Sequence, residues 1–349
     1  MSNSRISVCL PNYNHSRYLR EAIDALTQQS LPPHEIIVVD DASTDDSVPI
    51  LEGLKREFPQ LILLRNETNQ GCCRSTNRAI AAATGDYIFA TAADDLVLPG
   101  YFEQSVAGLQ KYPLAGVCVA RVKYIDDAGA EVPHTKLFYR LSADARRKEK
   151  AANYLDPSDV IARLKRDPWF LHGGPSPLYR REVILAAGGL HDELGPYTDW
   201  FNVHYAALKH GMVYVPKPLV AFRLIAGGFG ESSSHSPLTA IDKLAKVLQL
   251  MRDSKFQDVF PPGFVLRKEA EFAYYAFAGS MNHSHRSLRA GIDLIMPPVS
   301  VFDQAMLQLV TKLHQASKAV LLFYCRRKRN VIRWPDENRP STYNPEVVN

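Results

Sequence analysis

The chain has 349 residues, with 41 Lys and Arg residues against 37 Asp and Glu residues and a formal net charge of +4. A hydrophobic fraction of 46% and a charged fraction of 22% are typical of a globular protein, which excludes a disordered chain, a collagen and a disulfide-stapled miniprotein. The length is typical of one large domain or of a domain with an appendage. The small positive charge does not indicate nucleic-acid binding, and we expect no nucleic-acid partner.

The five cysteines are an odd number, and no two of them are spaced as CxxC. This disfavours a disulfide framework and a zinc knuckle and indicates a reducing, cytoplasmic location. Only a short apolar stretch precedes Pro11, unlike a signal peptide. No run of about 18 apolar residues is present, so we expect no helix that spans a bilayer.

Strand-like and helix-like segments alternate over the first 125 residues. The hydrophobic pattern predicts strands at 6–10, 35–39, 61–64, 87–90 and 116–122, and helices at 16–29, 74–83 and 100–110. A further helix is expected between Ser43, its predicted N-cap, and Pro59. This alternation predicts an α/β sheet covered by helices on both faces, with a ligand at the edge where the strands end.

The pattern changes after residue 125. Residues 126–170 show no regular rhythm, and the basic stretch 140–150 is interpreted as an exposed loop. Residues 173–230 are rich in Gly, Pro and aromatic residues and include a short strand at 212–215. A helical pattern begins at Thr239.

Two pairs of acids follow predicted strands. Asp40 and Asp41 come after the strand at 35–39, and Asp94 and Asp95 come soon after the strand at 87–90. A carboxylate at such an edge accepts hydrogen bonds from a nucleobase or a ribose, and Mg²⁺ or Mn²⁺ binds one or two carboxylates together with substrate phosphates. The alternative for the first pair is a purely local role, in which one Asp begins the turn and caps the next helix.

The order of these segments resembles the family 2 inverting glycosyltransferases, which have the GT-A fold. The matching stretches are ISVCLPNYNHSRYLREAIDAL, EIIVVDDASTDDS, NQGCCRSTNRAIAAATGDYIFATAADDLVLPGYFE and, more loosely, GPYTDWFNVHYAALKHG. The first three cover nearly all of residues 5–103. The resemblance thins between residues 125 and 170 and is absent after about residue 230.

The resemblance implies a GT-A, Rossmann-like mixed sheet with helices on both faces, followed by a helical C-terminal region. We expect a catalytic domain over 1–235, with a nucleotide half at about 1–125 and an acceptor half at about 126–235. A helical region over 236–333 and a poorly ordered tail over 334–349 would follow.

The resemblance also implies an inverting, hexosyltransferase-type enzyme of polysaccharide or glycoconjugate biosynthesis. Its donor would be a nucleotide-diphospho-sugar, with UDP favoured and GDP and dTDP left open. Its acceptor would be a saccharide or a lipid-linked molecule. Its cofactor would be a divalent cation, Mn²⁺ or Mg²⁺.

Residue by residue, the resemblance assigns a donor site and a metal site. The residues expected beside the donor are Pro11, Tyr13, Asn14, Asp40, Asp41, Asn69, Gly71, Asn77, Asp94 and Arg223. Asp94 matches the last acid of the DxD motif and is the expected metal ligand, with Asp95 beside it. Arg223 follows a strand where the family often has a basic residue near the diphosphate, which suits the bidentate guanidinium.

Two positions depart from the family pattern. Ala92 stands at the first DxD position, and Thr76 stands where an arginine commonly precedes the asparagine of the N-x-G…N element. The missing carboxylate predicts weakened or altered metal binding. It also keeps open a degenerate, non-catalytic protein that only binds nucleotide sugars.

Inverting transfer requires a carboxylate that deprotonates the acceptor hydroxyl. The resemblance places this general base at Asp199, for which the structural alternative is a helix N-cap. Asp192 and Glu193 are the fallback bases. On the acceptor side we expect His172, Gly173 and Trp200.

The end of the chain is basic, with Lys318, Arg326, Arg327, Lys328, Arg329 and Arg333 after an apolar helix face. A basic amphipathic helix lies readily on anionic lipid, which would place the protein at the inner face of the membrane. A solvated surface and a homodimer interface are the alternatives. The loop Pro11–Asn14 disfavours a sugar nucleotidyltransferase and a dinucleotide-binding dehydrogenase, because both need a Gly-rich loop after the first strand.

Overall fold

The computed structural model describes residues 4–132, 153–166, 170–171, 174, 176–225, 237–269 and 272. The chain forms two compact units. The first comprises residues 1–192 and 198–228, and the second comprises residues 193–197 and 229–349.

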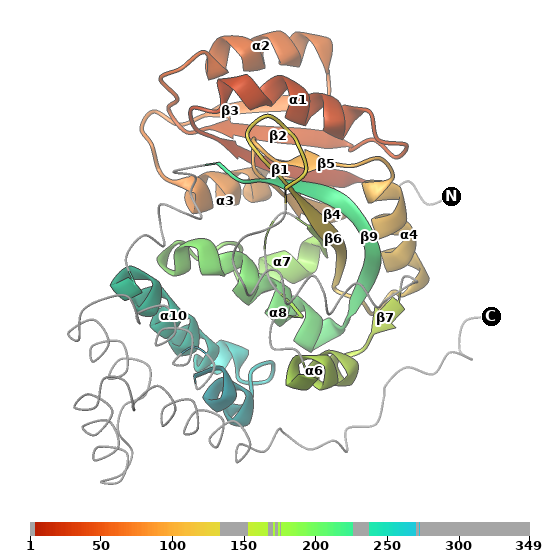
Figure 1. Cartoon of the computed structure of the whole chain (residues 1–349), viewed down its shortest axis with the longest axis vertical. Coiled ribbons are helices and arrows are strands. Elements are labelled where there is room, and N and C mark those ends of the chain that lie inside the picture. The colour runs from red at the N-terminus through yellow and green to blue at the C-terminus, as the bar shows by residue number, and fades with distance from the viewer. Residues whose placement is uncertain are drawn as a thin grey trace. The chain divides into compact units, whose positions relative to one another are not determined.

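A nine-stranded mixed sheet forms the centre of the first unit (Figure 1). Its strands are β1 (Ile6–Asn12), β2 (Glu35–Asp40), β3 (Leu61–Arg65), β4 (Tyr87–Ala90), β5 (Leu96–Val97), β6 (Val117–Ile125), β7 (Asn153–Leu155), β8 (Pro177–Arg180) and β9 (Met212–Arg223). Their order is β3-β2-β1-β4-β8-β6-β9-β5, with β7 paired to β9. Strands β3, β2, β1 and β4 pair with one another in parallel, whereas β8 is antiparallel to both β4 and β6. The predicted mixed α/β class is confirmed.

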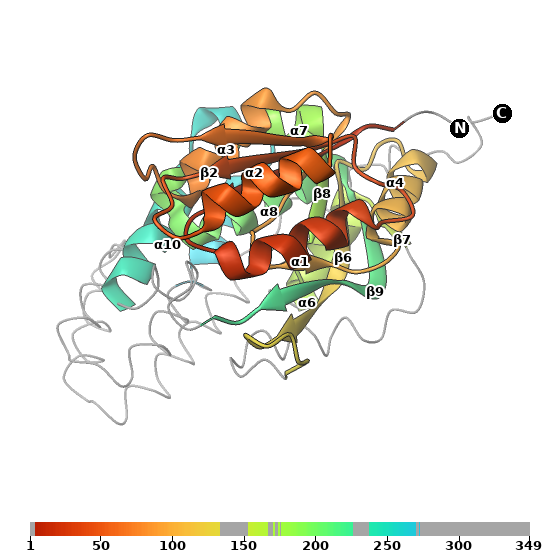
Figure 2. The ribbon, with the colours of Figure 1, turned by 90° about the horizontal axis from the view of Figure 1, so that it is seen from above.

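Helices cover both faces of this sheet (Figures 1 and 2). One face carries α1 (Ser16–Thr27), α2 (Ser47–Glu57) and α4 (Tyr101–Lys111), and the other contacts α3 (Cys72–Ala82), α7 (Arg181–Ala187) and α8 (Thr198–His210). Successive side chains of a strand point to opposite faces. Ile6, Val8 and Leu10 of β1 therefore all pack in the core beneath α1 and α2.

Two expectations for the first unit were wrong. Helix α2 begins at Ser47 and not near Ser43, because the Ser43 hydroxyl accepts a hydrogen bond from the backbone N–H of Asn14 and one from the Asn12 amide. The stretch 126–170, expected to be irregular, contains β7 and α6 (Pro157–Arg166). The basic segment 140–150 lies outside the described residues.

The described part of the second unit is helical. It contains α10 (Pro237–Met251), the single turn η2 (Ser254–Phe256) and a helical segment at 262–269, and its buried side chains include Val247, Met251, Phe260 and Phe264. The expected helical C-terminal region is thus borne out over these residues. The basic stretch that prompted the membrane and dimer hypotheses lies outside the described residues. Among the helices that are described, none has the length and apolar character needed to cross a bilayer.

Parallel pairing brings the ends of β1, β2, β3 and β4 to one edge of the sheet. Asn12 is in register with Asp40, Asp40 with Arg65, and Cys9 with Ala90. Strand β9 returns to the same region, because its second half pairs with β5 and sets Ala221 opposite Leu96. The loops that follow these strands carry most of the residues expected in the site.

Candidate active site

Asp40 and Asp41 lie at the end of β2, and both are buried. The Asp40 carboxylate accepts hydrogen bonds from Asn12 Nδ2 at 2.9 Å and from the backbone N–H of Ser43 at 3.1 Å. These bonds fix the start of the loop that follows β2 against the end of β1. Asp40 therefore stabilises the conformation of this loop.

Asp41 organises a second loop. Its Oδ1 accepts from Asn66 Nδ2 at 2.6 Å and from the backbone N–H of Gln70 at 2.8 Å, and its Oδ2 accepts from the N–H of Gly71 at 2.8 Å. Bonds to an ionised acceptor are the stronger kind. The Asp41 carboxylate thus ties the loop before α3 to the end of β2.

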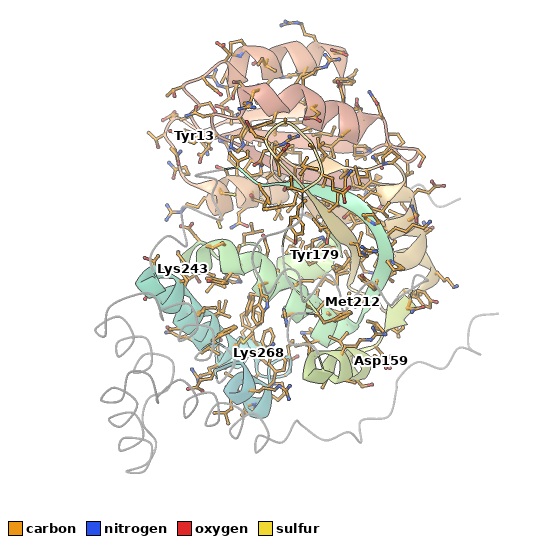
Figure 3. The ribbon with its side chains drawn as sticks, viewed as in Figure 1. Tyr13, Asp159, Tyr179, Met212, Lys243 and Lys268 are labelled. Carbon is orange, nitrogen blue, oxygen red and sulfur yellow. The ribbon has the colours of Figure 1, made fainter. Side chains whose placement is uncertain are left out.

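Tyr13 and Asn14 follow β1. Asn14 has a left-handed backbone (φ 56°), a conformation that Asn tolerates better than most residues. Its Oδ1 accepts from the backbone N–H groups of Thr44 at 2.7 Å and Asp45 at 3.3 Å, so it holds the neighbouring loop. Tyr13 is 44% exposed, which leaves its ring free to contact a ligand (Figure 3).

The N-x-G…N element has two different roles. Asn69 Oδ1 accepts from the N–H of Gly71 at 3.0 Å, directly before α3. The Asn77 amide donates to the Leu190 carbonyl and accepts from the Leu190 N–H, both at 2.7 Å. We therefore expect Asn77 to stabilise the turn after α7, in place of the donor contact that the sequence predicts.

Asp94 and Asp95 lie between β4 and β5 and differ in their surroundings. Asp95 is buried, and its Oδ1 accepts from the backbone N–H of Arg223 at 2.9 Å. Burial raises the pKa of Asp95 well above its ordinary value, and the charge of Asp94 adds to this. The Asp94 side chain keeps 14% exposure, and burial raises its pKa while the charges of His15 and Arg223 oppose the rise. Asp94 is thus the acid of this pair that remains open to a ligand.

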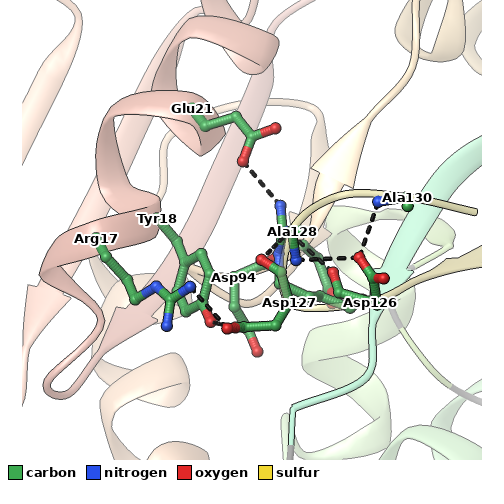
Figure 4. Close-up of polar contacts among 10 residues, drawn as sticks. Arg17, Tyr18, Glu21, Asp94, Asp126, Asp127, Ala128 and Ala130 are labelled. Carbon is green, nitrogen blue, oxygen red and sulfur yellow. Dashed lines mark hydrogen bonds and ion pairs between the residues drawn. The ribbon is translucent and has the colours of Figure 1, made fainter.

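The Arg223 side chain is buried. Its partners Glu21, Asp94, Asp126 and Asp127 come from three segments and lie together in Figure 4. Its Nε donates to the Asp94 carbonyl at 2.9 Å, its Nη1 to the carbonyls of Asp126 and Asp127 at 3.1 Å, and its Nη2 to Glu21 at 2.8 Å. It also lies 4.9 Å from the centre of the Tyr18 ring. These bonds support the Asp94–Asp95 turn from within the protein. We therefore expect Arg223 to stabilise this turn, in place of the contact with a diphosphate that the sequence predicts.

Asp199 lies in the first turn of α8, one residue after the helix begins at Thr198. The structural alternative of an N-cap therefore does not apply. Burial raises its pKa to about 6, and a backbone hydrogen bond from Gly174 opposes the rise. The residue is only partly exposed. A carboxylate of this kind stays ionised at neutral pH yet can take up a proton.

Three acids from distant segments converge near Cys72, the first residue of α3. Burial raises the pKa of the Cys72 thiol to about 12, and the negative charges of Asp199, Asp94 and Asp41 each contribute to the rise. Asp199 also raises the pKa values of Asp95 and Tyr179, in each case as a smaller contribution than burial. The three carboxylates therefore share one region at the carboxyl edge of the sheet.

The expected acceptor side is described only in part. Trp200 is buried, and its ring lies 3.9 Å from the ring of His204, so it packs inside the protein instead of facing a sugar. His172 and Gly173 lie outside the described residues. Of the fallback bases, Asp192 is exposed and pairs with Arg74 at 3.1 Å, and Glu193 belongs to the second unit.

The donor set can be compared with the needs of a divalent cation. In the part of the chain that the structure describes, no three His, Cys, Asp or Glu side chains form a ready cluster for a metal. Mg²⁺ and Mn²⁺ sites that bind nucleotides need fewer protein ligands, since phosphates and water complete the shell. A partly exposed carboxylate such as Asp94 fits such an ion.

Some residues of the site were not predicted from the sequence. Asn66 follows β3 and donates hydrogen bonds to Asp41 and Ser75. Its place directly after a predicted strand is the sequence signal that could have assigned it to this edge of the sheet. Glu21 and Tyr18 belong to the α1 face beside Arg223, and only the packing of α1 brings them there.

The strand order and the two helical layers are those of a GT-A fold. A sequence profile described as Glycosyl transferase family 2 matches residues 7–184, just over half of the chain. The chain therefore belongs to glycosyl transferase family 2.

Among curated proteins, the chain is 38% identical to EpsE of Bacillus subtilis over 112 residues, which are 32% of this chain and 40% of EpsE. It is 29% identical to the uncharacterized protein MT1568 of Mycobacterium tuberculosis over 222 residues, which are 61% of this chain and 65% of that protein. The chain thus spans less than two thirds of the length of these relatives.

Among solved structures, TarS residues 1–349 of S. aureus in complex with UDP-GlcNAc matches with a TM-score of 0.65 at 18% identity, covering 93% of this chain and 90% of that TarS fragment. The mannosyltransferase PcManGT of Pyrobaculum calidifontis, in complex with GDP-Man and Mn²⁺, matches with a TM-score of 0.54 at 19% identity, covering 94% and 87%. At these identities the matches show a shared fold.

Proposed function

We propose that the protein transfers a sugar from a nucleotide-diphospho-sugar to an acceptor hydroxyl, with inversion at the anomeric carbon. The observation that carries the proposal is that the charges of Asp41, Asp94 and Asp199, from three distant segments, all act on Cys72 at the start of α3. The complexes of TarS with UDP-GlcNAc and of PcManGT with GDP-Man support a nucleotide-sugar donor. Family membership and the expected pattern favour a hexosyltransferase of polysaccharide or glycoconjugate biosynthesis acting on a saccharide or lipid-linked acceptor.

Asp199 is proposed as the general base. With a pKa of about 6, it is ionised in roughly nine tenths of the molecules at pH 7. As the acceptor oxygen attacks the anomeric carbon, its proton passes to Asp199 and the bond from that carbon to the diphosphate oxygen breaks. The sugar is then joined to the acceptor with inverted configuration, and the nucleoside diphosphate leaves.

The donor is proposed to lie over the loops after β1, β2 and β3. Asp40, Asp41, Asn14 and Asn69 fix these loops through internal hydrogen bonds, which pre-organises their backbone before the donor arrives. Tyr13, two residues after Pro11, offers an exposed ring to the nucleoside, and Gly71 allows a close approach of the backbone.

Asp94 is proposed to hold a divalent cation, since it is the acid of the Asp94–Asp95 pair whose side chain remains open. When bound, such an ion would neutralise charge on the departing diphosphate. Asp95 supports the same turn through its bond to Arg223.

A second candidate is a protein that binds nucleotide sugars without transferring them. Ala92 favours it, because the first DxD carboxylate is missing, and so does Thr76, whose hydroxyl donates to the Cys72 carbonyl within α3. Binding is common to both candidates, so only turnover separates them.

A thermal-shift screen tests the proposal. UDP, GDP and dTDP, free and as their sugar conjugates, would be added with and without Mn²⁺. A ligand that binds only the folded state at a hundred times its Kd stabilises that state by about 2.7 kcal/mol. We expect one nucleotide class to raise the melting temperature, more so with Mn²⁺, and to be consumed over time. Binding without consumption would support the second candidate, and no shift with any nucleotide would contradict both.

A further inference from the structure

We propose that His15 is the second protein ligand of the divalent ion held by Asp94, and that it takes over the position in the ligand set that Ala92 leaves empty. The inference rests on the proposed function, since it assumes that an ion and a nucleotide diphosphate bind beside Asp94.

The topology places the two residues together. His15 lies in the loop between β1 and α1, and Asp94 lies in the turn between β4 and β5. Because β1 and β4 are adjacent and parallel, with Cys9 opposite Ala90, both loops leave the sheet at the same edge. The ring atom Nδ1 of His15 lies 4.0 Å from Oδ1 of Asp94.

This separation leaves both atoms available. A distance of 4.0 Å is too long for a hydrogen bond between these two atoms, so neither atom is occupied by the other. Ligand distances in such sites are about 2.1 Å, so two atoms 4.0 Å apart would both be near enough to reach one ion. The side chains are 33% and 14% exposed, which leaves room for phosphate and water ligands.

The two groups are also held in place. The His15 ring meets the ring of Tyr18 edge to face, with centroids 5.9 Å apart, and Tyr18 in turn binds Asp127 through its hydroxyl. The Nε of Arg223 donates to the backbone carbonyl of Asp94, and the Arg223 guanidinium lies over the same Tyr18 ring. One cluster therefore positions both ligands before the ion arrives.

The ligand chemistry makes a specific claim about the metal. Mg²⁺ prefers oxygen ligands in a near-ideal octahedron, and it accepts an imidazole ligand less readily than Mn²⁺ does. Replacing one carboxylate by an imidazole should therefore favour Mn²⁺ over Mg²⁺. Ala92 is partly exposed, so an added carboxylate at this position has space.

The test is pulsed electron paramagnetic resonance of Mn²⁺ with UDP and tag-free protein labelled with ¹⁵N in its histidines. A ³¹P coupling reports that the ion is bound to the diphosphate, and a ¹⁵N coupling reports a histidine ligand directly. We expect both couplings in the wild type and loss of only the ¹⁵N coupling in His15→Gln. The matched control is His34→Gln, because His34 is exposed at the start of β2 and should keep both couplings.

Affinity gives a second readout. Loss of a supporting group around a metal costs about 10- to 100-fold in affinity, and loss of a direct ligand should cost at least as much. We expect His15→Gln to weaken Mn²⁺ binding by about tenfold or more, to weaken Mg²⁺ binding less, and to melt at the wild-type temperature without metal. Adding Ala92→Asp should restore much of the affinity.

The outcomes separate the two proposals. A ³¹P coupling without a ¹⁵N coupling in the wild type would overturn the role of His15 and leave the proposed function intact. Absence of both couplings would count against metal-assisted binding of the donor as well as against His15. A ¹⁵N coupling that persists in His15→Gln would assign the ligand to another histidine and overturn the inference.

Discussion

Arg223 and Glu21, 202 residues apart in the sequence, form an ion pair of 2.8 Å in which the arginine side chain is 2% exposed and the glutamate side chain 54%. Arg223 is the last residue of β9, and Glu21 lies on the surface of α1. Glu21 is therefore the exposed partner of a guanidinium that also donates to backbone carbonyls inside the protein. This asymmetry predicts different costs for the two partners.

Arg223→Met should destabilise the fold by about 3 kcal/mol, because it leaves the carbonyls of Asp94, Asp126 and Asp127 without their donor. Glu21→Gln should cost less than about 1 kcal/mol, as is usual for an exposed partner. Urea unfolding of both variants measures the difference. Equal, small losses in the two variants would show that the arginine does not support the Asp94–Asp95 turn.

Asp199→Asn should lower turnover by about 10²- to 10⁴-fold while leaving donor affinity within about twofold of the wild type, since the base acts on the acceptor. In the wild type, kcat/KM should fall about tenfold for each pH unit below about 6, because only the ionised carboxylate accepts a proton. Steady-state kinetics and calorimetry check both statements.

Asp192→Asn is the control for this pair of measurements. Asp192 is an exposed fallback base paired with Arg74, and its variant should keep the wild-type pH profile. Loss of turnover in Asp192→Asn together with survival of turnover in Asp199→Asn would move the base to Asp192.

The buried charge of Asp199 should also lower the stability of the folded state at neutral pH. Its pKa of about 6 in the folded chain exceeds the value of about 3.9 expected in an unfolded chain. Between these values the folded state binds more protons than the unfolded state, so the free energy of unfolding decreases as pH rises through the interval. The side chain at this position of the Asp199→Asn variant cannot ionise. At pH 7.5 the free energy of unfolding of this variant should therefore exceed that of the wild type by on the order of 1 kcal/mol, after allowing for solvent screening, and its melting temperature should be higher.

The same variant should show no such gain near pH 4, where the wild-type carboxyl is already protonated. Differential scanning calorimetry at the two pH values tests the sign. A melting temperature below that of the wild type at pH 7.5 would contradict an unfavourable, buried charge at this position.

Asn77→Ala should destabilise the protein without weakening the donor complex. The variant removes the two 2.7 Å hydrogen bonds to the backbone of Leu190, which should cost about 2 kcal/mol. Donor affinity, measured by calorimetry below the melting temperature, should stay within about twofold of the wild type. A tenfold loss of affinity at unchanged stability would instead return Asn77 to the nucleotide site.

The sequence predicted the parallel half of the sheet well, because β1 to β4 and the helices between them have clear hydrophobic periods. It did not predict α6 or α7, because both helices are short and lie among segments without a clear hydrophobic pattern. The antiparallel insertion of β8 between β4 and β6 was also not predictable, since it depends on long-range pairing.

For the site, the sequence indicated which residues lie at the edge of the sheet but not what each side chain does there. Asp41 and Asn14 could be placed from strand ends, yet their partners are backbone groups of neighbouring loops. Arg223 looked like a phosphate ligand because nothing in its local sequence reveals Glu21 or the enclosing carbonyls. Such partners are fixed only by tertiary packing.

The central claim is that Asp199 directs an inverting transfer from a nucleotide sugar. The most direct measurement is ¹H NMR of slow donor hydrolysis, in which water replaces the unknown acceptor and the first sugar released is observed before it equilibrates. From an α-linked donor chosen by the thermal-shift screen, the account predicts the β anomer as the first product with the wild type and none above background with Asp199→Asn. First release of the α anomer, or unchanged release by Asp199→Asn, would contradict it.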